Sequence, residues 1–406
     1  MSMDNKVPDI RFKGFSGAWD KKILGDLVKL ENGFAFQSKY FKNKPTQVIV
    51  LTPGSVNIGG GFKAGKGQYY DEKQEVPSKY VFKPGEMFIT MTDLTPTAQA
   101  LGFPAIIPKD ENTYLHNQRL GKLVGFQGDI AFLYNLLRTT IKQKEVVLAS
   151  SGTTVKHTSP DKFLNRICLF PKKQEQTIIG NYFQKLDSLI NQHQQKHDKL
   201  NNIKKAMLEK MFPKPGETIP EIRFKGFSGE WEERAFSDIA TRVSIHHQST
   251  CLPCVEYEDI VAGEGCLNKD IYQKKIFKAG LKFKAGDILF GKLRPYLKNW
   301  FLADFEGLAV GDFWVLRADN VASTFLFSLI QTSKFEYISN LSAGSKMPRS
   351  DWGLVSSSCF FVPKDIFESN EIGNYFQKLD TLINLHQQQI TKLNNIKQAC
   401  LSKMFV

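Results

Sequence analysis

The stretch IGNYFQKLDSLINQHQQKHDKLNNIKKAMLEKMF, residues 179–212, decides the fold of this 406-residue chain because it occurs twice. It returns at residues 372–405 as IGNYFQKLDTLINLHQQQITKLNNIKQACLSKMF, at an offset of 193 residues, and 26 of the 34 positions are identical. A near-copy of a long segment indicates that a structural unit has been duplicated. The chain is therefore expected to consist of two related halves.

Each copy has the apolar spacing of a coiled-coil helix. Apolar residues recur at alternating steps of three and four, and no Gly or Pro interrupts the pattern after Gly180 or Gly373. At ~1.5 Å per residue each helix would be ~50 Å long, and the simplest partner for each is its own copy. The predicted helix–helix or partner interface consists of Tyr182, Leu186, Leu189, His193, Leu200, Ile203, Tyr375, Leu379, Leu382, His386, Leu393 and Ile396. Four residues flank this seam and either contact a partner or complete the core within the chain: Phe183, Ile190, Phe376 and Ile383.

A second duplicated segment opens each half. VPDIRFKGFSGAW (residues 7–19) returns as IPEIRFKGFSGEW (residues 219–231), so the order marker, variable region and long helix occurs twice. The prolines of the connecting segment PKPGETIP (213–220) end the first helix and favour an extended chain. If the chain ends were joined, the sequence would be a two-fold circular repeat. This pattern predicts a pseudo-two-fold axis relating two antiparallel helices.

Antiparallel pairing would place His193 opposite His386, with glutamines beside both residues. A polar layer in an apolar seam commonly fixes the register of a helix pair at a cost in stability. Metal binding is the alternative for this pair, but two histidines without a nearby carboxylate or thiolate are too few ligands.

The two variable regions predict mixed α/β domains with the same layout and different loops. Strands are expected at residues 48–56, 86–91, 104–108 and 119–126, and a helix at 129–147. In the second half, residues 282–299, 313–318 and 323–341 correspond to 81–98, 119–126 and the first-half helix, and 359–364 correspond to 168–173. A shared scaffold with divergent loops suggests one fold serving two specificities.

Composition favours a polyanionic partner. The chain has 54 Lys and Arg against 41 Asp and Glu, a formal charge of +13. The first residues, MSMDNKVPDIRF, do not resemble a signal peptide, and no apolar run is long enough for a membrane span. The six cysteines mostly lie in hydrophobic contexts, which favours a reduced cytoplasmic location.

Catalytic signatures are not found. The glycines in GGGFKAGKG (59–67) suggest a phosphate-binding loop, but no GKS or GKT follows, so a hairpin or flexible loop is favoured. Cys251 and Cys254 have CxxC spacing, but zinc needs four ligands, and a reduced thiol pair is the alternative. There is no HExxH, no GxSxG, no Asn- or Asp-Pro-Pro-aromatic motif of an amino-methyltransferase, and no persuasive carboxylate cluster for a nuclease metal.

Polar loops that follow the predicted strands carry the chemistry of DNA recognition. Arg and Lys donate to phosphates and guanine edges, Gln and Asn pair with adenine, and Asp accepts from cytosine. Ordinary solvated loop residues are the alternative. The candidate DNA-binding residues are Thr92, Asp93, Thr95, Gln99, Asn117, Gln118, Arg119, Thr153, Lys156, His157, Lys292, Arg294, Tyr296, Lys298, Lys346 and Arg349.

The whole chain resembles the specificity (S) subunit of a type I restriction-modification system. The resemblance rests on the marker IRFKGFSGxW before each variable region, the strand in KAGDILFGKLRPYLKN (284–299), and the helix IGNYFQKLDxLI…KLNNIKxAxLxKMF after each. The first-half segment PGEMFITMTDLT departs from the strand pattern, which leaves the alignment of its loop in doubt.

The resemblance implies five segments: target recognition domain 1 (1–175), a first spacer helix (176–212), a linker (213–220), target recognition domain 2 (221–370) and a second spacer helix (371–406). It implies a non-catalytic subunit that recognises a bipartite, asymmetric double-stranded DNA target, with two methyltransferase subunits and restriction subunits as partners and no membrane. It also implies that S-adenosylmethionine, ATP and Mg belong to those partners, with no cofactor or metal in this chain. The competing hypotheses are a non-specific basic scaffold and a fused DNA-modifying enzyme.

Overall fold

The computed structural model describes residues 6–95, 97–249, 251–273, 278–341 and 347–406. The chain divides into two compact units, Met1–Ile190 with Thr391–Val406, and Asn191–Ile390. Each unit therefore takes one part of each long helix, whereas the sequence predicted five consecutive segments. Within the described ranges, no helix is both long and apolar enough to cross a bilayer.

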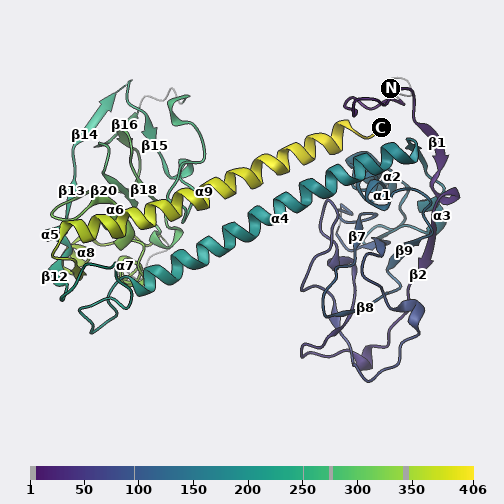
Figure 1. Cartoon of the computed structure of the whole chain (residues 1–406), viewed down its shortest axis with the longest axis horizontal. Coiled ribbons are helices and arrows are strands. Elements are labelled where there is room, and N and C mark those ends of the chain that lie inside the picture. The colour runs from purple at the N-terminus through teal and green to yellow at the C-terminus, as the bar shows by residue number, and fades with distance from the viewer. Residues whose placement is uncertain (1–5, 96, 250, 274–277, 342–346) are drawn as a thin grey trace. The chain divides into compact units, whose positions relative to one another are not determined.

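The two long helices are α4 (Lys173–Lys210) and α9 (Ile366–Lys403), each of 38 residues (Figure 1). In the first unit, Tyr182 contacts Cys400 and Asp187 pairs with Lys397. The residue number falls on one helix as it rises on the other, so these parts of the helices are antiparallel. Lys204–Asp380 and His193–His386 show the same order within the second unit.

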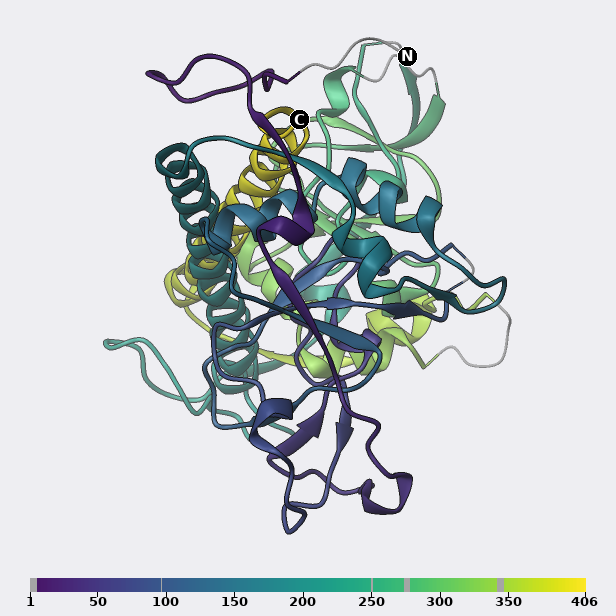
Figure 2. The same ribbon diagram turned by 90° about the vertical axis from the view of Figure 1, so that its right-hand side faces the viewer.

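The first unit contains a four-stranded sheet in the order β2 (Lys29–Asn32), β9 (Leu120–Val124), β5 (Met87–Thr90), β7 (Pro104–Ile106). A separate two-stranded sheet pairs β1 (Asp20–Ile23), drawn in purple in Figures 1 and 2, with β11 (Ile167–Phe170). A smaller sheet joins β4 (Gln68–Tyr69), β3 (Val48–Val50) and β8 (Thr113–Leu115). The remaining elements are α1 (Ile130–Leu137), α2 (Thr140–Ala149), α3 (Pro160–Leu164) and the pair β6 (Thr92–Asp93) and β10 (Lys156–His157).

The second unit repeats this sheet as β13 (Ala240–Val243), β20 (Phe313–Ala318), β17 (Ile288–Gly291), β18 (Trp300–Leu302). The pair β12 (Glu232–Ala235) and β21 (Cys359–Val362) corresponds to β1 and β11. Its other sheet has the order β14 (His246–Ser249), β16 (Lys278–Phe283), β19 (Gly307–Ala309), β15 (Cys254–Val255). The short helices are α5 (Phe236–Ile239), α6 (Ser323–Leu329), α7 (Ser333–Ser339) and α8 (Trp352–Ser357). The predicted mixed α/β repeat is thus confirmed.

Two details of the sequence prediction were wrong. The sequence predicted one helix at residues 129–147 and one at 323–341, and each is two helices in the structure. The break occurs because Thr139 and Thr332 cap new helices, with side-chain oxygens that accept a hydrogen bond from the backbone N–H three residues later. Phe170 pairs with Asp20, the first residue of β1, and Val362 pairs with Glu232, the first residue of β12. Phe170 therefore corresponds to Val362. Cys168 therefore corresponds to Phe360, one residue away from the alignment of 168–173 with 359–364.

A buried ion pair joins each marker to the start of a long helix. Arg11 donates Nε and Nη2 to the two carboxylate oxygens of Glu175 at 2.7 Å each, and Glu175 is 2% exposed. Arg223 binds Glu368 in the same way at 2.6 and 2.7 Å. A two-point Arg–carboxylate contact fixes orientation as well as charge, so each pair sets the angle at which the marker meets its helix.

The residue before each arginine binds the end of the other helix. The Ile10 N–H donates to the Lys403 carbonyl at the end of α9, and the Ile222 N–H donates to the Lys210 carbonyl at the end of α4. Each marker therefore connects one helix end to the other helix start inside its own unit. This arrangement is the pseudo-two-fold circular repeat that the sequence predicts.

The glycine that opens each repeated helix permits close approach. A Cβ at Gly180 would lie 2.3 Å from the Asp129 carboxylate that caps α1, and one at Gly373 would lie 2.1 Å from the Thr324 hydroxyl oxygen of α6. Any larger side chain would push α1 or α6 away from the long helix. This contact packs α1 closely against α4, and α6 closely against α9.

Replacing Glu175 with Gln should lower the free energy of unfolding of the first unit by about 3 kcal/mol, because Arg11 then keeps a buried positive charge without its counter-charge. Urea unfolding followed by tryptophan fluorescence measures this change. The double replacement Arg11→Met with Glu175→Leu should recover much of the loss, since both charges are then absent. The matched control is Glu111→Gln, an exposed carboxylate in the same unit; equal effects of the two Glu→Gln changes would contradict the role given to the ion pair.

Candidate nucleic-acid interface

Three loop segments of the first unit meet at one end of its four-stranded sheet, which we call the main sheet. Thr92 and Asp93 pair with His157 and Lys156 across β6 and β10. The Met91 N–H donates to the Arg119 carbonyl, and the Met91 carbonyl accepts from the Thr158 N–H. We call residues 91–93, 117–119 and 156–158 the first polar corner. The structure thus brings together Thr92, Arg119, Lys156 and His157, which the sequence had placed in separate loops.

The second unit has the same backbone arrangement. The Lys292 N–H donates to the Asp312 carbonyl, and the Lys292 carbonyl accepts from the Ser350 N–H. Leu293 bridges to Arg349, as Thr92 pairs with His157. We call residues 292–294, 312 and 348–350 the second polar corner. Equivalent hydrogen bonds align Met91 with Lys292, Arg119 with Asp312 and His157 with Arg349.

The two corners differ in charge at equivalent positions of this common backbone. In the first corner the middle segment carries a cation, Arg119, whose guanidinium is exposed and has no hydrogen-bond or ion-pair partner among the described residues, while Lys156 and His157 lie on a flanking segment. The second corner has Asp312 at that place and cations on both sides of it. Asp312 lies 3.0 Å from Arg349 and 3.6 Å from Lys292. The two corners therefore present different patterns of donors and acceptors.

Tyr257 supports the second corner. Its hydroxyl donates to the Asp312 carbonyl and accepts from the Leu293 N–H at 3.2 Å. Burial raises the pKa of Tyr257 to about 12, so its hydroxyl remains a neutral donor at physiological pH. Composition did not single out Tyr257 or Asp312, because both residues precede the loops that it selected.

Several of the candidate DNA-binding residues use their side chains for hydrogen bonds within their own loops. Asp93 is buried, and its carboxylate accepts from the Thr95 and Ala100 N–H groups at 2.7 and 2.6 Å. This placement does not support the expectation that Asp93 accepts from a base. The Thr95 hydroxyl accepts from the Gln99 N–H, and the Asn117 carbonyl oxygen of the side chain accepts from the Arg119 N–H. Exposed side chains are left at Gln99, Gln118 and Thr153.

The segment after β17 in the second unit is tightly turned. Arg294 and Lys298 have positive φ angles of 50° and 57°, and the Lys298 ammonium pairs with Glu336 at 2.8 Å. Between them the Tyr296 side chain is 52% exposed. Lys346, the remaining candidate of this unit, lies outside the described residues.

The predicted seam residues mostly lie at or beside the two cores. Leu186 and Leu379 are buried, while Tyr182, Leu393 and Ile396 pack on the first core and Leu200, Ile203 and Tyr375 on the second. Three flanking positions, Phe183, Phe376 and Ile383, are also buried, at 0%, 1% and 3% exposed. Phe183 belongs to the first core and Phe376 to the second. Leu189 is half-buried, whereas Leu382 is 43% exposed and lies outside the buried seam.

His193 and His386 lie opposite one another, as antiparallel pairing predicts. Their Nδ1 atoms are 2.9 Å apart, so one ring donates and the other accepts. Burial, together with His193, Lys196 and His197, lowers the pKa of His386. Among the described residues, no group of three or more His, Cys, Asp or Glu side chains is placed to hold a metal ion. At the CxxC, Cys251 is exposed and Cys254 is buried.

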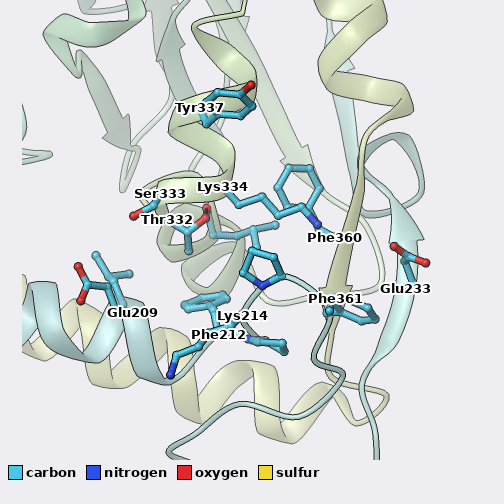
Figure 3. Close-up of a pocket in the computed structure, with 15 residues that line it drawn as sticks. Glu209, Phe212, Lys214, Glu233, Thr332, Ser333, Lys334, Tyr337, Phe360 and Phe361 are labelled. Atoms are coloured by element: carbon cyan, nitrogen blue, oxygen red, sulfur yellow. Dashed lines mark hydrogen bonds between the residues drawn. The ribbon is translucent and has the colours of Figure 1, made fainter.

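A cavity of about 800 Å³ lies in the second unit between the end of α4, the linker after it, α7 and β21 (Figure 3). Its walls include Phe212, Phe360, Phe361 and Tyr337, and Lys334 lies 5.3 Å from the centre of the Phe360 ring. It includes no residue of the second polar corner. Charged and hydroxyl side chains also line it: Glu209, Lys214, Glu233, Thr332, Ser333 and Lys334.

His116 directly precedes residues 117–119 of the first polar corner. It is 1% exposed, its Nε2 donates to the Leu120 carbonyl at 3.0 Å, and its ring centre lies 4.8 Å from that of Phe82. Burial lowers the pKa of His116 to about 4. The folded chain therefore holds this ring neutral at pH values where an unfolded chain, with a pKa of about 6.5, would protonate it.

The first unit should lose up to about 3 kcal/mol of stability as pH falls from about 6.5 to about 4, because the unfolded state binds the extra proton over that range. Unfolding of the full chain followed at a series of pH values measures the slope. His116→Gln keeps a neutral donor and should flatten that slope, whereas the exposed His157→Gln should not. An unchanged slope in His116→Gln would contradict this assignment.

The comparisons with known proteins agree with this geometry. Residues 17–202 match the family model for the type I restriction modification DNA specificity domain. The EcoDI specificity subunit of Escherichia coli, from a type I restriction enzyme, is 23% identical over 312 residues, which are 68% of this chain and 69% of that protein. The MjaVIII specificity subunit of Methanocaldococcus jannaschii is 22% identical over 286 residues, 64% of this chain and 66% of that protein.

A solved structure shows the same fold. It is the crystal structure of a type I restriction-modification system S subunit from M. genitalium, which matches with a TM-score of 0.64 at 12% identity and covers 98% of this chain and 99% of that chain. The family model covers the first half, and the duplicated marker, main sheet and helix extend the same organisation to the second. The chain is similar in sequence to type I restriction-modification specificity subunits, and its first half matches the DNA specificity domain of that family.

Proposed function

We propose that this chain recognises a bipartite, asymmetric DNA sequence, with one half-site bound by each unit, and directs methyltransferase and restriction subunits to that sequence. The supporting observation is the pair of polar corners, which share a backbone and differ in charge. Two identical corners would favour a palindromic target. Two corners that carry opposite charges at one equivalent position, Arg119 and Asp312, favour half-sites of different sequence.

Each corner has a group suited to a purine edge. A guanidinium can donate two hydrogen bonds to guanine O6 and N7 in the major groove. In the first corner we assign this role to Arg119. In the second we assign it to Arg349, with Asp312 holding the guanidinium in place, since an arginine fixed by a carboxylate loses less side-chain entropy on binding.

The partners in this proposal are two methyltransferase subunits, one for each repeat, together with restriction subunits. S-adenosylmethionine, ATP and Mg would be bound by those partners, and the complex would act in the cytoplasm. The exposed Leu382 and Leu385 on α9, at 43% and 47% exposed, are candidate partner contacts on the second unit. The antiparallel helices would set the gap between half-sites, since a paired helix is stiffer than a loop.

The two competing hypotheses predict different behaviour. A fused modifying enzyme would need its own cofactor site, whereas the corners offer only hydrogen-bonding and charged groups. A basic scaffold would bind all duplexes alike. Mapping modified bases in a genome that expresses this chain with its partners separates these cases, because only a specificity subunit yields one bipartite motif. Modification at unrelated sequences would contradict the proposal.

Arg119→Ala should relax the first half-site at one base pair and leave the second half-site unchanged, with a loss of about 1–3 kcal/mol of discrimination there. Arg349→Ala should do the same in the second half-site only. Binding of purified protein to duplexes with single substitutions at each position measures both effects.

The matched control is Lys364→Gln, which removes an exposed charge between β21 and α9 without touching either corner. It should weaken binding to all duplexes equally or leave it unchanged. A change in both half-sites after Arg119→Ala would contradict the assignment of one unit to one half-site.

Inserting seven residues into both α4 and α9, at positions that face each other, should lengthen the preferred gap by about 3 base pairs. Seven helical residues add about 10 Å, and B-DNA rises about 3.4 Å per base pair. Insertion into α4 alone shifts one helix against the other and should abolish folding or assembly. Modified-site mapping measures the gap, and an unchanged gap in a folded double-insertion variant would exclude the helices as spacers.

A further inference from the structure

A cleft of about 320 Å³ in the second unit opens beside the second polar corner. Its walls come from the end of β13, from β14, β16 and β19, and from the start of β20, and Lys292 belongs to both the cleft and the corner. Three basic side chains line it: Arg242, His246 and Lys292. None of the described residues that line it is acidic.

The Arg242 guanidinium lies over the Trp352 ring. Its carbon lies 5.0 Å from the centre of that ring. A cation stacked on an aromatic face keeps its N–H donors in the guanidinium plane free for an anion. No described residue accepts a hydrogen bond from this guanidinium.

Lys292 is held loosely. Its ammonium lies 3.6 Å from the Asp312 carboxylate, and the side chain is 31% exposed. An ammonium has three donors, so Lys292 can keep Asp312 and still donate to a second anion. Gly311 in the wall leaves room for a group to approach the backbone, since a Cβ built there would meet nothing within 4 Å.

The first unit does not repeat this site. Leu30 pairs with Leu123, and Arg242 pairs with Leu316, the equivalent leucine of the second unit. Leu30 therefore stands where the second unit has Arg242. Met91 stands where the second unit has Lys292. Both cations are therefore particular to the second half, which argues against a role in the common scaffold.

We propose that this cleft binds a backbone phosphate of the DNA at the half-site of the second unit. The inference rests on the proposed function, and it adds a sequence-independent contact next to the corner that recognises bases. A phosphate at this position would fix how the duplex lies against Asp312 and Arg349. Binding through it should weaken with salt, because each phosphate contact releases a counterion.

The test compares salt dependence of binding for the full-length chain on a labelled duplex carrying the mapped target and on a scrambled duplex. Arg242→Gln and Lys292→Gln should each lower the slope of log K against log salt by about 0.9 for a lost contact on both duplexes. The ratio of target to scrambled affinity should stay within about twofold for Arg242→Gln. Arg242→Lys keeps the charge and should keep the slope.

Three outcomes would overturn the cleft assignment. One is an unchanged slope in both Gln variants with normal thermal unfolding; if Arg242→Gln does not fold, Lys292→Gln alone decides. Another is an equal change in Lys225→Gln, an exposed control in the marker of the same unit. The third is stabilisation by millimolar inorganic phosphate that Arg242→Gln abolishes without any change in DNA binding, which would assign the cleft to free phosphate. A wild-type chain that prefers no duplex sequence would instead contradict the proposed function.

Discussion

The fold depends on the ion pair between each marker and the start of a long helix. Arg11 with Glu175, and Arg223 with Glu368, are two-point contacts with carboxylates that are at most 2% exposed. A buried carboxylate without its arginine would be unstable, so the marker and the helix start are constrained to meet. Since the residue before each arginine also binds the end of the other helix, one short segment holds two helix ends in each unit. This constraint explains why the marker and the helix are the duplicated parts of the sequence, while the regions between them differ.

The same constraint allows the recognition surfaces to diverge. The main sheet has the same strand order in both units, and the backbone hydrogen bonds around Met91 and Lys292 are equivalent. The exposed Arg119 side chain has no hydrogen-bond or ion-pair partner among the described residues, so this position can change without loss of the fold. Arg119 and Asp312 occupy one backbone position with opposite charges. Two units with the same sheet order thereby present different surfaces.

The repeat, the mixed fold and the antiparallel helices could be predicted from the sequence, because duplication and heptad spacing can be read directly from the order of residues. The sequence was also sufficient to place His193 against His386. It could not identify Glu175 and Glu368, since a carboxylate near a helix start is ordinary and only its arginine partner, 164 or 145 residues away, makes it structural. It selected Asp93 for its polarity, whereas the structure buries that carboxylate against two backbone N–H groups. It missed Asp312, Tyr257 and Arg242 because their roles come from strands brought together by the sheet. The helix breaks at Thr139 and Thr332 were hidden by apolar spacing that continues across the turn.

The central claim is that each unit recognises its own half-site. The most direct measurement replaces residues 24–166 with the equivalent segment of a known specificity subunit and maps the modified sites. These boundaries keep β1, β11 and the Arg11–Glu175 pair intact. The account predicts a motif in which one half-site changes to that of the donor, while the other half-site and the gap are retained. A chimaera that folds and modifies DNA but changes both half-sites, or neither, would contradict it.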